Sequence, residues 1–225
     1  MDLKIEDVSE LLHVSEETIR RWIHKKQIPT YTLHDEYRFN RLEIENWMVH
    51  SPVFKDKDLE EAGNAKMGSQ QFSLFRAVHN GDVLVDVPGG TKLELISHVA
   101  QVAAIKLSLD PDFVTELLLD RENLSSTALN HGVAVPHPRE LVVKGPIDRI
   151  IVAFPKTPID FDAMDGEPVH TFFFLFSSQD KRHLHLLAKI AYLSSQPDAL
   201  ELLRLKPSKE EFLTFLKAWE GSFSS

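Results

Sequence analysis

The chain has 225 residues and no cysteine, which excludes disulfide bridges, thiolate metal sites and cysteine nucleophiles. Its apolar share of 43% supports a hydrophobic core, and its net charge of −9 argues against a general nucleic-acid binder. The amino terminus lacks the basic and apolar segments of a signal peptide, and the apolar runs are far shorter than the ~20 residues that span a bilayer. We therefore expect a soluble, cytoplasmic protein with no membrane partner.

A change in composition divides the chain into two units. Residues 51–71 combine scattered charge with Gly63 and Gly68 and show little apolar periodicity, which is typical of a linker. The division predicts a small unit over residues 1–50 and a larger unit over residues 72–222.

The small unit is predicted to contain three helices and a strand pair. Apolar residues at i, i+3, i+4 predict a first helix around residues 8–12 and a second that begins after the N-cap Ser15 and ends at Pro29. β-prone residues around a polar turn predict a hairpin over residues 30–39. Asn40, with a glutamate three residues later, resembles a capping box and predicts the third helix.

The large unit alternates between strand and helix patterns. The runs over residues 150–154 and 172–176 are unbroken and apolar, as is typical of strands covered on both faces. The fold class is therefore α/β, with a mixed sheet sandwiched by helices. The other predicted elements are strands at 83–87 and 132–135 and helices at 92–106, 111–121, 180–193, 198–205 and 208–219.

The segment LLHVSEETIRRWIHKKQIPTYTLHDEYRFNRLEIENWM, residues 11–48, resembles the MerR/excisionase-type winged helix-turn-helix module. The resemblance implies DNA as a partner of residues 1–50. With the apolar stripe of the second helix buried, its opposite face presents basic residues, and arginine reads guanine edges while lysine neutralises phosphates. Arg41, near the start of the third helix, is a further candidate for backbone contact. The candidate DNA-binding residues are Thr18, Arg20, Arg21, Lys25, Lys26 and Arg38.

The charge of the small unit leaves an alternative open. Residues 1–50 contain seven Lys/Arg and ten Asp/Glu, a net charge of −3, whereas a solitary DNA binder is usually basic. If the protein is a homodimer, binding through two weak half-sites compensates for the lack of net positive charge in each unit. Alternatively, the small unit docks a protein partner and its basic cluster is a solvated face.

Three stretches of the large unit carry a second resemblance. They are DRENLSSTALNHGVAVPHPRE at 120–140, PIDFDAMDGEPV at 158–169 and DKRHLHLL at 180–187. Together they resemble the enzyme IIA domains of the fructose–mannitol class of the bacterial sugar phosphotransferase system, and most nearly the nitrogen-regulatory, PtsN-like branch. The resemblance covers residues 72–219 and implies an enzyme IIA type 2-like fold.

This resemblance implies a phosphohistidine site. His137 matches the phosphoryl acceptor, Arg121 the cation that binds the phosphoryl group, and His183 the second active-site histidine. The implied donor is an HPr-type histidine phosphocarrier, and no cofactor is implied. The hydroxyls of Ser126 and Thr127 are expected to line the pocket.

The chemistry of His137 agrees with that role. A neutral imidazole, with an unperturbed pKa of ~6.5, is a competent nucleophile near pH 7. Pro136 and Pro138 restrict the backbone on both sides, and we expect them to hold the ring in a fixed, exposed pose. Many relatives have a small residue after the phosphorylated histidine, whereas this chain has Pro138, which lacks a backbone N–H to donate to a phosphate. We expect Arg139 to supply a charge instead. His131 stands where relatives often carry asparagine.

These histidines have two further interpretations. His131, His137, His183 and His185 are possible metal ligands, but no carboxylate–histidine helix motif accompanies them, and we expect no metal site. If the segment is helical, His183 and His185 diverge and His185 is structural. Three functional hypotheses follow: a phosphorylation-dependent regulator, a IIA phosphocarrier that passes the group onward, and an interaction protein in which His137 is never modified.

Overall fold

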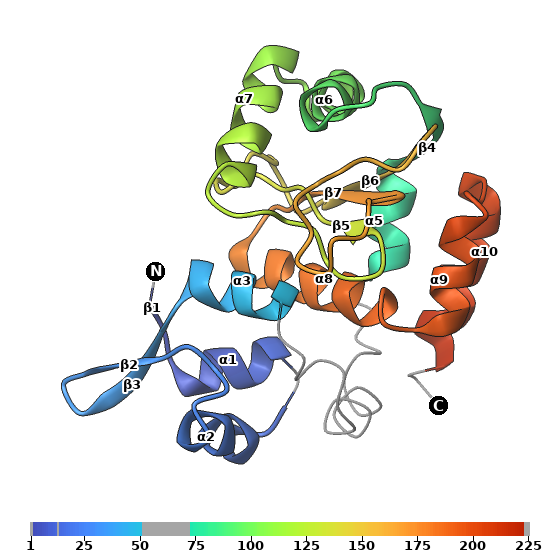
Figure 1. The fold of residues 1–225 in the computed structure, drawn as a ribbon. Coiled ribbons are helices and arrows are strands. Elements are labelled where there is room, and N and C mark those ends of the chain that lie inside the picture. The colour runs from blue at the N-terminus through green and yellow to red at the C-terminus, as the bar shows by residue number, and fades with distance from the viewer. Residues whose placement is uncertain (1, 13, 51–72, 223–225) are drawn as a thin grey trace.

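The computed structural model of the chain describes residues 2–12, 14–50 and 73–222. These residues form an N-terminal unit, residues 2–50, and a C-terminal unit, residues 73–222 (Figure 1). The predicted linker over residues 51–71 lies outside the described residues. In the part of the chain that is described, no helix is long and apolar enough to cross a membrane.

The N-terminal unit contains three helices and a small antiparallel sheet. The order along the chain is β1 (Asp2–Leu3), α1 (Ile5–Leu12), α2 (Glu16–His24), β2 (Tyr31–Leu33), β3 (Glu36–Asn40) and α3 (Arg41–His50). The sheet order is β1-β3-β2, so β2 and β3 form the predicted hairpin and β1 adds a strand that the sequence did not indicate.

The caps of these helices agree with the sequence. The Ser15 hydroxyl accepts a hydrogen bond from the backbone N–H of Thr18 at 3.1 Å, and the Asn40 amide oxygen accepts from the N–H of Leu42 at 2.9 Å. The predicted end of the second helix at Pro29 is wrong. Helix α2 ends at His24, because the chain turns at Lys26, which adopts a left-handed conformation with φ 54°.

The C-terminal unit is built on a mixed four-stranded sheet of order β4-β6-β7-β5, in which β6 and β7 are antiparallel and the outer pairs are parallel. This confirms the predicted fold class. The elements in chain order are α5 (Leu74–Asn80), β4 (Asp82–Val87), α6 (Lys92–Leu107), α7 (Pro111–Glu122), β5 (Val133–Ala134), β6 (Arg149–Pro155), β7 (Thr171–Phe176), α8 (Asp180–Leu193), α9 (Pro197–Arg204) and α10 (Lys209–Ser222).

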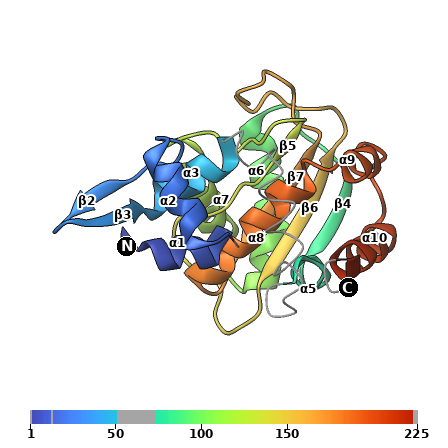
Figure 2. The ribbon, with the colours of Figure 1, turned by 90° about the horizontal axis from the view of Figure 1, so that it is seen from below.

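Helices cover both faces of this sheet (Figures 1 and 2). Phe172 and Phe174 of β7 pack with buried residues of α6 and α7, whereas Phe173 and Leu175 pack with α5, α8, α9 and α10. This alternation follows from the period of two along a strand. It explains why the run over residues 172–176 is apolar throughout.

Helix α5 was not predicted, and its position depends on a glycine. Ser73 caps the helix, and Gly81 follows its last turn. A Cβ atom on Gly81 would lie 1.8 Å from the carbonyl oxygen of Ile150 in β6. The close approach of α5 to the central strand therefore requires glycine at this position.

The two units are packed against each other. Both α1 and α3 contact α8, and the two views show them alongside it (Figures 1 and 2). Buried side chains of the N-terminal unit and of the α8 face of the sheet form one continuous hydrophobic cluster. An ion pair between Glu10 of α1 and Lys181 of α8 lies at the edge of this contact.

Candidate functional site

His137 lies in the segment that follows β5, and hydrogen bonds to the sheet fix the backbone around it. The N–H of Val135 donates to the carbonyl of Thr127 at 2.9 Å, and the N–H of Leu175 donates to the carbonyl of Pro136 at 3.0 Å. Since proline cannot donate to its neighbours, the carbonyl of Pro136 carries this attachment. The Cα position of His137 is thus tied to the central strands.

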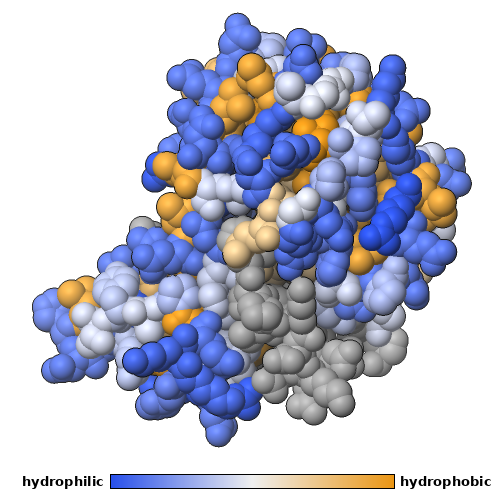
Figure 3. Space-filling model, in the orientation of Figure 1, coloured by the Kyte–Doolittle hydropathy of each residue, from blue (hydrophilic) through white to orange (hydrophobic). Residues whose placement is uncertain are grey.

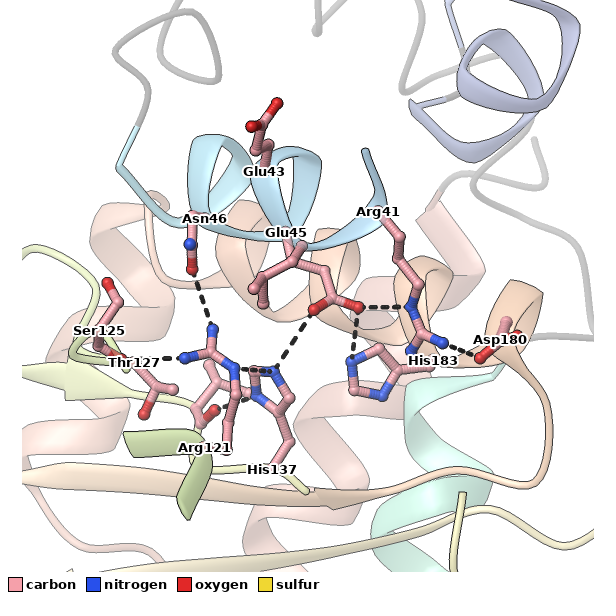
Figure 4. A network of polar contacts seen from close by, with 12 residues as sticks. Arg41, Glu43, Glu45, Asn46, Arg121, Ser125, Thr127, His137, Asp180 and His183 are labelled. Atoms are coloured by element: carbon pink, nitrogen blue, oxygen red, sulfur yellow. Dashed lines mark hydrogen bonds and ion pairs between the residues drawn. The ribbon is translucent and has the colours of Figure 1, made fainter. Parts of the chain in front are cut away.

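The hydrogen bonds of the ring determine its tautomer. Nδ1 of His137 lies 2.7 Å from the carbonyl oxygen of Val135. A carbonyl oxygen only accepts, so Nδ1 carries the hydrogen and Nε2 carries the lone pair. Nε2 in turn accepts a hydrogen bond from Nε of Arg121 at 3.2 Å. The nitrogen of His137 that is able to act as a nucleophile is therefore Nε2, and it faces Arg121 and Glu45 in Figure 4.

Both histidines of the site are neutral. Burial and the neighbouring Arg121 guanidinium lower the pKa of His137 to about 3. Burial, followed by the nearby His137, lowers the pKa of His183 well below its usual value. The two rings meet edge to face with their centroids 4.8 Å apart. An uncharged imidazole with an unprotonated nitrogen is the form that can attack phosphorus.

Arg121 is buried at the end of α7 and has a separate partner for each nitrogen. Besides His137, its Nη1 donates to the carbonyl of Ser125 at 2.9 Å, and its Nη2 donates to the side-chain oxygen of Asn46 at 3.0 Å. Burial lowers the pKa of Arg121, yet a guanidinium stays protonated in proteins. A fixed positive charge therefore lies beside Nε2 of His137.

Helix α3 of the N-terminal unit supplies a carboxylate to the same pocket (Figure 4). Glu45 is only 5% exposed. Its Oε1 accepts from Nε of Arg41 at 2.8 Å and lies 3.6 Å from Nε2 of His183, and its Oε2 lies 4.0 Å from Nε2 of His137. Because both imidazoles are neutral, the charge on Glu45 is balanced by the guanidiniums of Arg41 and Arg121. The sequence carries no signal for Glu45 and Asn46, since the apolar positions of a helix do not indicate which other unit the helix contacts.

Two expectations about exposure and contact are wrong. His137 is 1% exposed and not presented to solvent, because α3 covers the ring that the flanking prolines hold. Arg41, expected to contact nucleic acid, instead contacts Glu45 and Asp180 at the boundary of the two units.

The hydroxyls expected to line the pocket instead form hydrogen bonds with neighbouring segments of the chain. The Ser126 hydroxyl donates to the carbonyl of Phe161 at 2.6 Å. The Thr127 hydroxyl donates to the carboxylate of Glu122, also at 2.6 Å. Both hydroxyls therefore donate to groups outside the pocket, and these hydrogen bonds fix the chain between α7 and β5. Arg139 is exposed.

The other histidines lie differently. His185 is buried in α8, where the helical spacing separates it from His183, as expected for a helical segment. The backbone N–H of His131 donates to the carboxylate of Asp165 at 2.8 Å, and a possible ligand group joins His131 with Asp165 and Glu167.

Glu45, His137 and His183 each present one possible metal ligand atom, and these atoms lie within 4.8 Å of one another. The surrounding charge opposes a cation, because the lone pair of His137 already accepts from Arg121 and the carboxylate of Glu45 already pairs with Arg41. The chemistry of this pocket is that of an anion site.

The candidate DNA-binding residues of α2 and its following turn share one surface. This surface faces away from the C-terminal unit in Figure 1, and Figure 3 shows it as hydrophilic. Within it, Arg20 pairs with Glu16 at 3.6 Å and the Thr18 hydroxyl shares a 3.0 Å hydrogen bond with that of Ser15. Arg38 lies apart on β3 and pairs with Glu36 at 2.5 Å. The side chains exposed or partly exposed there are Thr18, Arg20, Arg21, Lys25 and Lys26.

Comparison with known proteins assigns the class. Residues 77–219 match the family described as "Phosphoenolpyruvate-dependent sugar phosphotransferase system, EIIA 2", and the chain belongs to this family. Residues 3–48 match a family described as "Helix-turn-helix domain". The resemblance to enzyme IIA domains is confirmed, and the small unit is confirmed as a helix-turn-helix domain.

Within that class the chain is similar to nitrogen regulatory proteins. It is 36% identical over 133 residues to the "Nitrogen regulatory protein" of Pseudomonas aeruginosa, with 58% of this chain and 85% of the relative covered. It is 33% identical over 136 residues to the protein of the same description from Escherichia coli K12, with 59% and 82% covered. The crystal structure of "Nitrogen Regulatory Protein IIA-Ntr" from Neisseria meningitidis is 32% identical, with a TM-score of 0.58 over 64% of this chain and 98% of that chain.

Proposed function

We propose that this protein is a cytoplasmic regulator linked to the phosphotransferase system, in which an HPr-type phosphocarrier reversibly phosphorylates His137. The N-terminal unit binds DNA or a partner, and the phosphorylation state of His137 modulates that binding. The observation that carries the proposal is the fixed tautomer of His137, which directs an unprotonated Nε2 at a buried guanidinium.

The transfer needs no proton. The Nε2 lone pair of His137 attacks the phosphorus of a phosphohistidine on the donor protein. As the new N–P bond forms, the donor N–P bond breaks and its electron pair returns to the donor imidazole. Arg121 supplies positive charge to the transferred oxygens, and His183 offers a ring nitrogen at the same place. Phosphoryl transfer depends mainly on such positioning and charge.

A labelling experiment tests the acceptor. Incubation with enzyme I, the HPr-type phosphocarrier and phosphoenolpyruvate is expected to give an acid-labile, alkali-stable adduct. His137→Gln abolishes it, and Arg121→Ala slows it. The matched control is His79→Gln, an exposed histidine on α5 outside the pocket, which labels like the wild type. Full labelling of His137→Gln overturns the site.

DNA binding is proposed for the basic surface of α2. Gel shifts with genomic fragments are expected to show retardation that weakens with salt, because phosphate contacts release counterions. Arg21→Ala weakens it, whereas Lys217→Ala removes another exposed charge, from α10, and leaves it unchanged. We propose that the protein binds DNA as a homodimer. The slope of binding affinity against salt concentration then reports more phosphate contacts than one N-terminal unit makes.

A second candidate function is favoured by the net charge of −3 over residues 1–50. In that case the protein is a IIA phosphocarrier or an interaction protein whose N-terminal unit docks a protein partner and not DNA. A chain that labels on His137 but gives no salt-sensitive retardation supports this candidate.

A further inference from the structure

The pocket proposed to receive the phosphoryl group is occupied by a carboxylate of the chain itself. Glu45 of α3 reaches between His137 and His183, and its two oxygens lie 4.0 Å and 3.6 Å from their Nε2 atoms (Figure 4). Non-bonded atoms are in van der Waals contact at ~3.5–4.0 Å. A phosphorus atom with three oxygens therefore has no room on Nε2 of His137 while Glu45 is in place.

The polar groups of the pocket match an anion at this position. Nε2 of His183 is buried and has no hydrogen-bond partner among the residues that the structure describes, so it faces Glu45 without a proper bond. Two guanidiniums flank the carboxylate, those of Arg41 and Arg121. Glu45 thus occupies the position of a phosphoryl group and has the same sign of charge. It satisfies the polar groups of the pocket less well than a group with three acceptor oxygens.

Neighbouring contacts hold α3 over the pocket. Asn46 accepts from Arg121, and Arg41 joins Glu45 to Asp180 of α8. The hydrophobic cluster continues from α3 into α8. In this docked arrangement His137 is 1% exposed, so a donor protein cannot bring its own phosphohistidine into line with Nε2.

We propose that α3 is an internal competitor of phosphorylation, in which Glu45 mimics the phosphoryl group and docking of the N-terminal unit excludes both the phosphocarrier and the phosphoryl group from His137. This inference rests on the proposed function, since it concerns regulation of the same site. The phosphocarrier acts only on the fraction of molecules in which α3 has left the pocket.

The competition is reciprocal. A phosphoryl group adds close to two negative charges, which repel the carboxylate of Glu45 and capture Arg121 from Asn46. The factor by which docking of α3 disfavours phosphorylation equals the factor by which phosphorylation disfavours docking. The modified protein therefore has a released N-terminal unit.

The position of α2 determines what this release changes. Its basic surface is already exposed in the docked arrangement, on the side away from the C-terminal unit. Phosphorylation therefore does not uncover the candidate DNA-binding residues. It frees the unit that carries them, together with the face of α3 that was buried on α8.

Glu45→Gln tests this inference, because it keeps the shape of the side chain and removes its charge. The matched control is Glu43→Gln, since Glu43 is exposed and points away from the pocket on the same helix (Figure 4). With the HPr-type donor, labelling of Glu45→Gln is expected to be about tenfold faster than that of the wild type, and Glu43→Gln to match the wild type.

Hydrogen exchange supplies a second readout. Phosphorylation of the wild type is expected to raise amide exchange in α3 and in the turns of α8 that α3 covers, and Glu45→Gln to raise it without phosphorylation. Equal labelling rates for wild type and Glu45→Gln, with unchanged exchange in α3, overturn this inference and leave the proposed function standing. No labelling of any variant overturns the proposed function, and this inference falls with it.

Discussion

Replacing Glu122 by alanine removes the carboxylate that holds the segment between α7 and the pocket of His137. Its Oε2 accepts two hydrogen bonds from Thr127, from the backbone N–H at 3.0 Å and from the hydroxyl at 2.6 Å. Its Oε1 accepts from Nζ of Lys92 at 3.0 Å. Glu122 is 4% and Thr127 0% exposed, so water does not replace these bonds in the native protein.

The structure sets the size of the effect. An unpaired buried donor costs about 1–3 kcal/mol, and the substitution leaves both donors of Thr127 unpaired. Lys92 loses little, because it is partly exposed and keeps Asp162 at 2.8 Å. We expect Glu122→Ala to lower the free energy of unfolding by about 3 kcal/mol.

Urea unfolding of a double-mutant cycle measures this. Thr127→Val removes the hydroxyl, so the cost of Glu122→Ala in that background is expected to fall by about 1–2 kcal/mol. Glu116→Ala, an exposed glutamate on the same helix, is the control and is expected to stay within about 0.5 kcal/mol of the wild type. A loss below about 1 kcal/mol for Glu122→Ala, or costs that simply add, would refute the reasoning.

Three other predictions concern pH and packing. The pKa of His137 is lower in the folded than in the unfolded protein, so the unfolded chain binds more protons below pH ~6.5. The free energy of unfolding therefore falls with pH, by about 1.4 kcal/mol at pH 5.5. Urea unfolding should show a smaller loss for His137→Gln. Gly81→Ala forces a Cβ to 1.8 Å from a carbonyl of β6 and should cost at least ~2 kcal/mol, while Gly90→Ala enters open space and should be nearly neutral; equal midpoints would contradict this. Phe174→Ala should cost about 3–5 kcal/mol in thermal or urea unfolding, whereas Ile105→Ala, 82% exposed, should not, and a similar cost for both would exclude the two-faced core.

Local patterns in the sequence predicted most of the elements. The apolar runs of β6 and β7 and the periodic helices were predicted to within a few residues, because strands and long helices bury faces of fixed period. Helix α5 was missed because seven residues give too short a pattern to identify. The end of α2 was misplaced because Lys26, whose left-handed conformation ends the helix, carries no turn signal of the glycine or asparagine kind.

Motifs in the sequence identified His137, Arg121 and His183, and the structure brings them together in one pocket. It also decided the partners of two pocket hydroxyls, which no local pattern contains. The hydroxyls of Ser126 and Thr127 turn to other partners.

By itself, then, the sequence determined the two units, the α/β class and the candidate chemistry of His137, since these depend on periodicity and residue type. Only the tertiary structure placed Glu45 against His137 and buried the ring. The physical reason is that contact between two units depends on complementary surfaces far apart in the chain, and the sequence of α3 is the same whichever surface it covers.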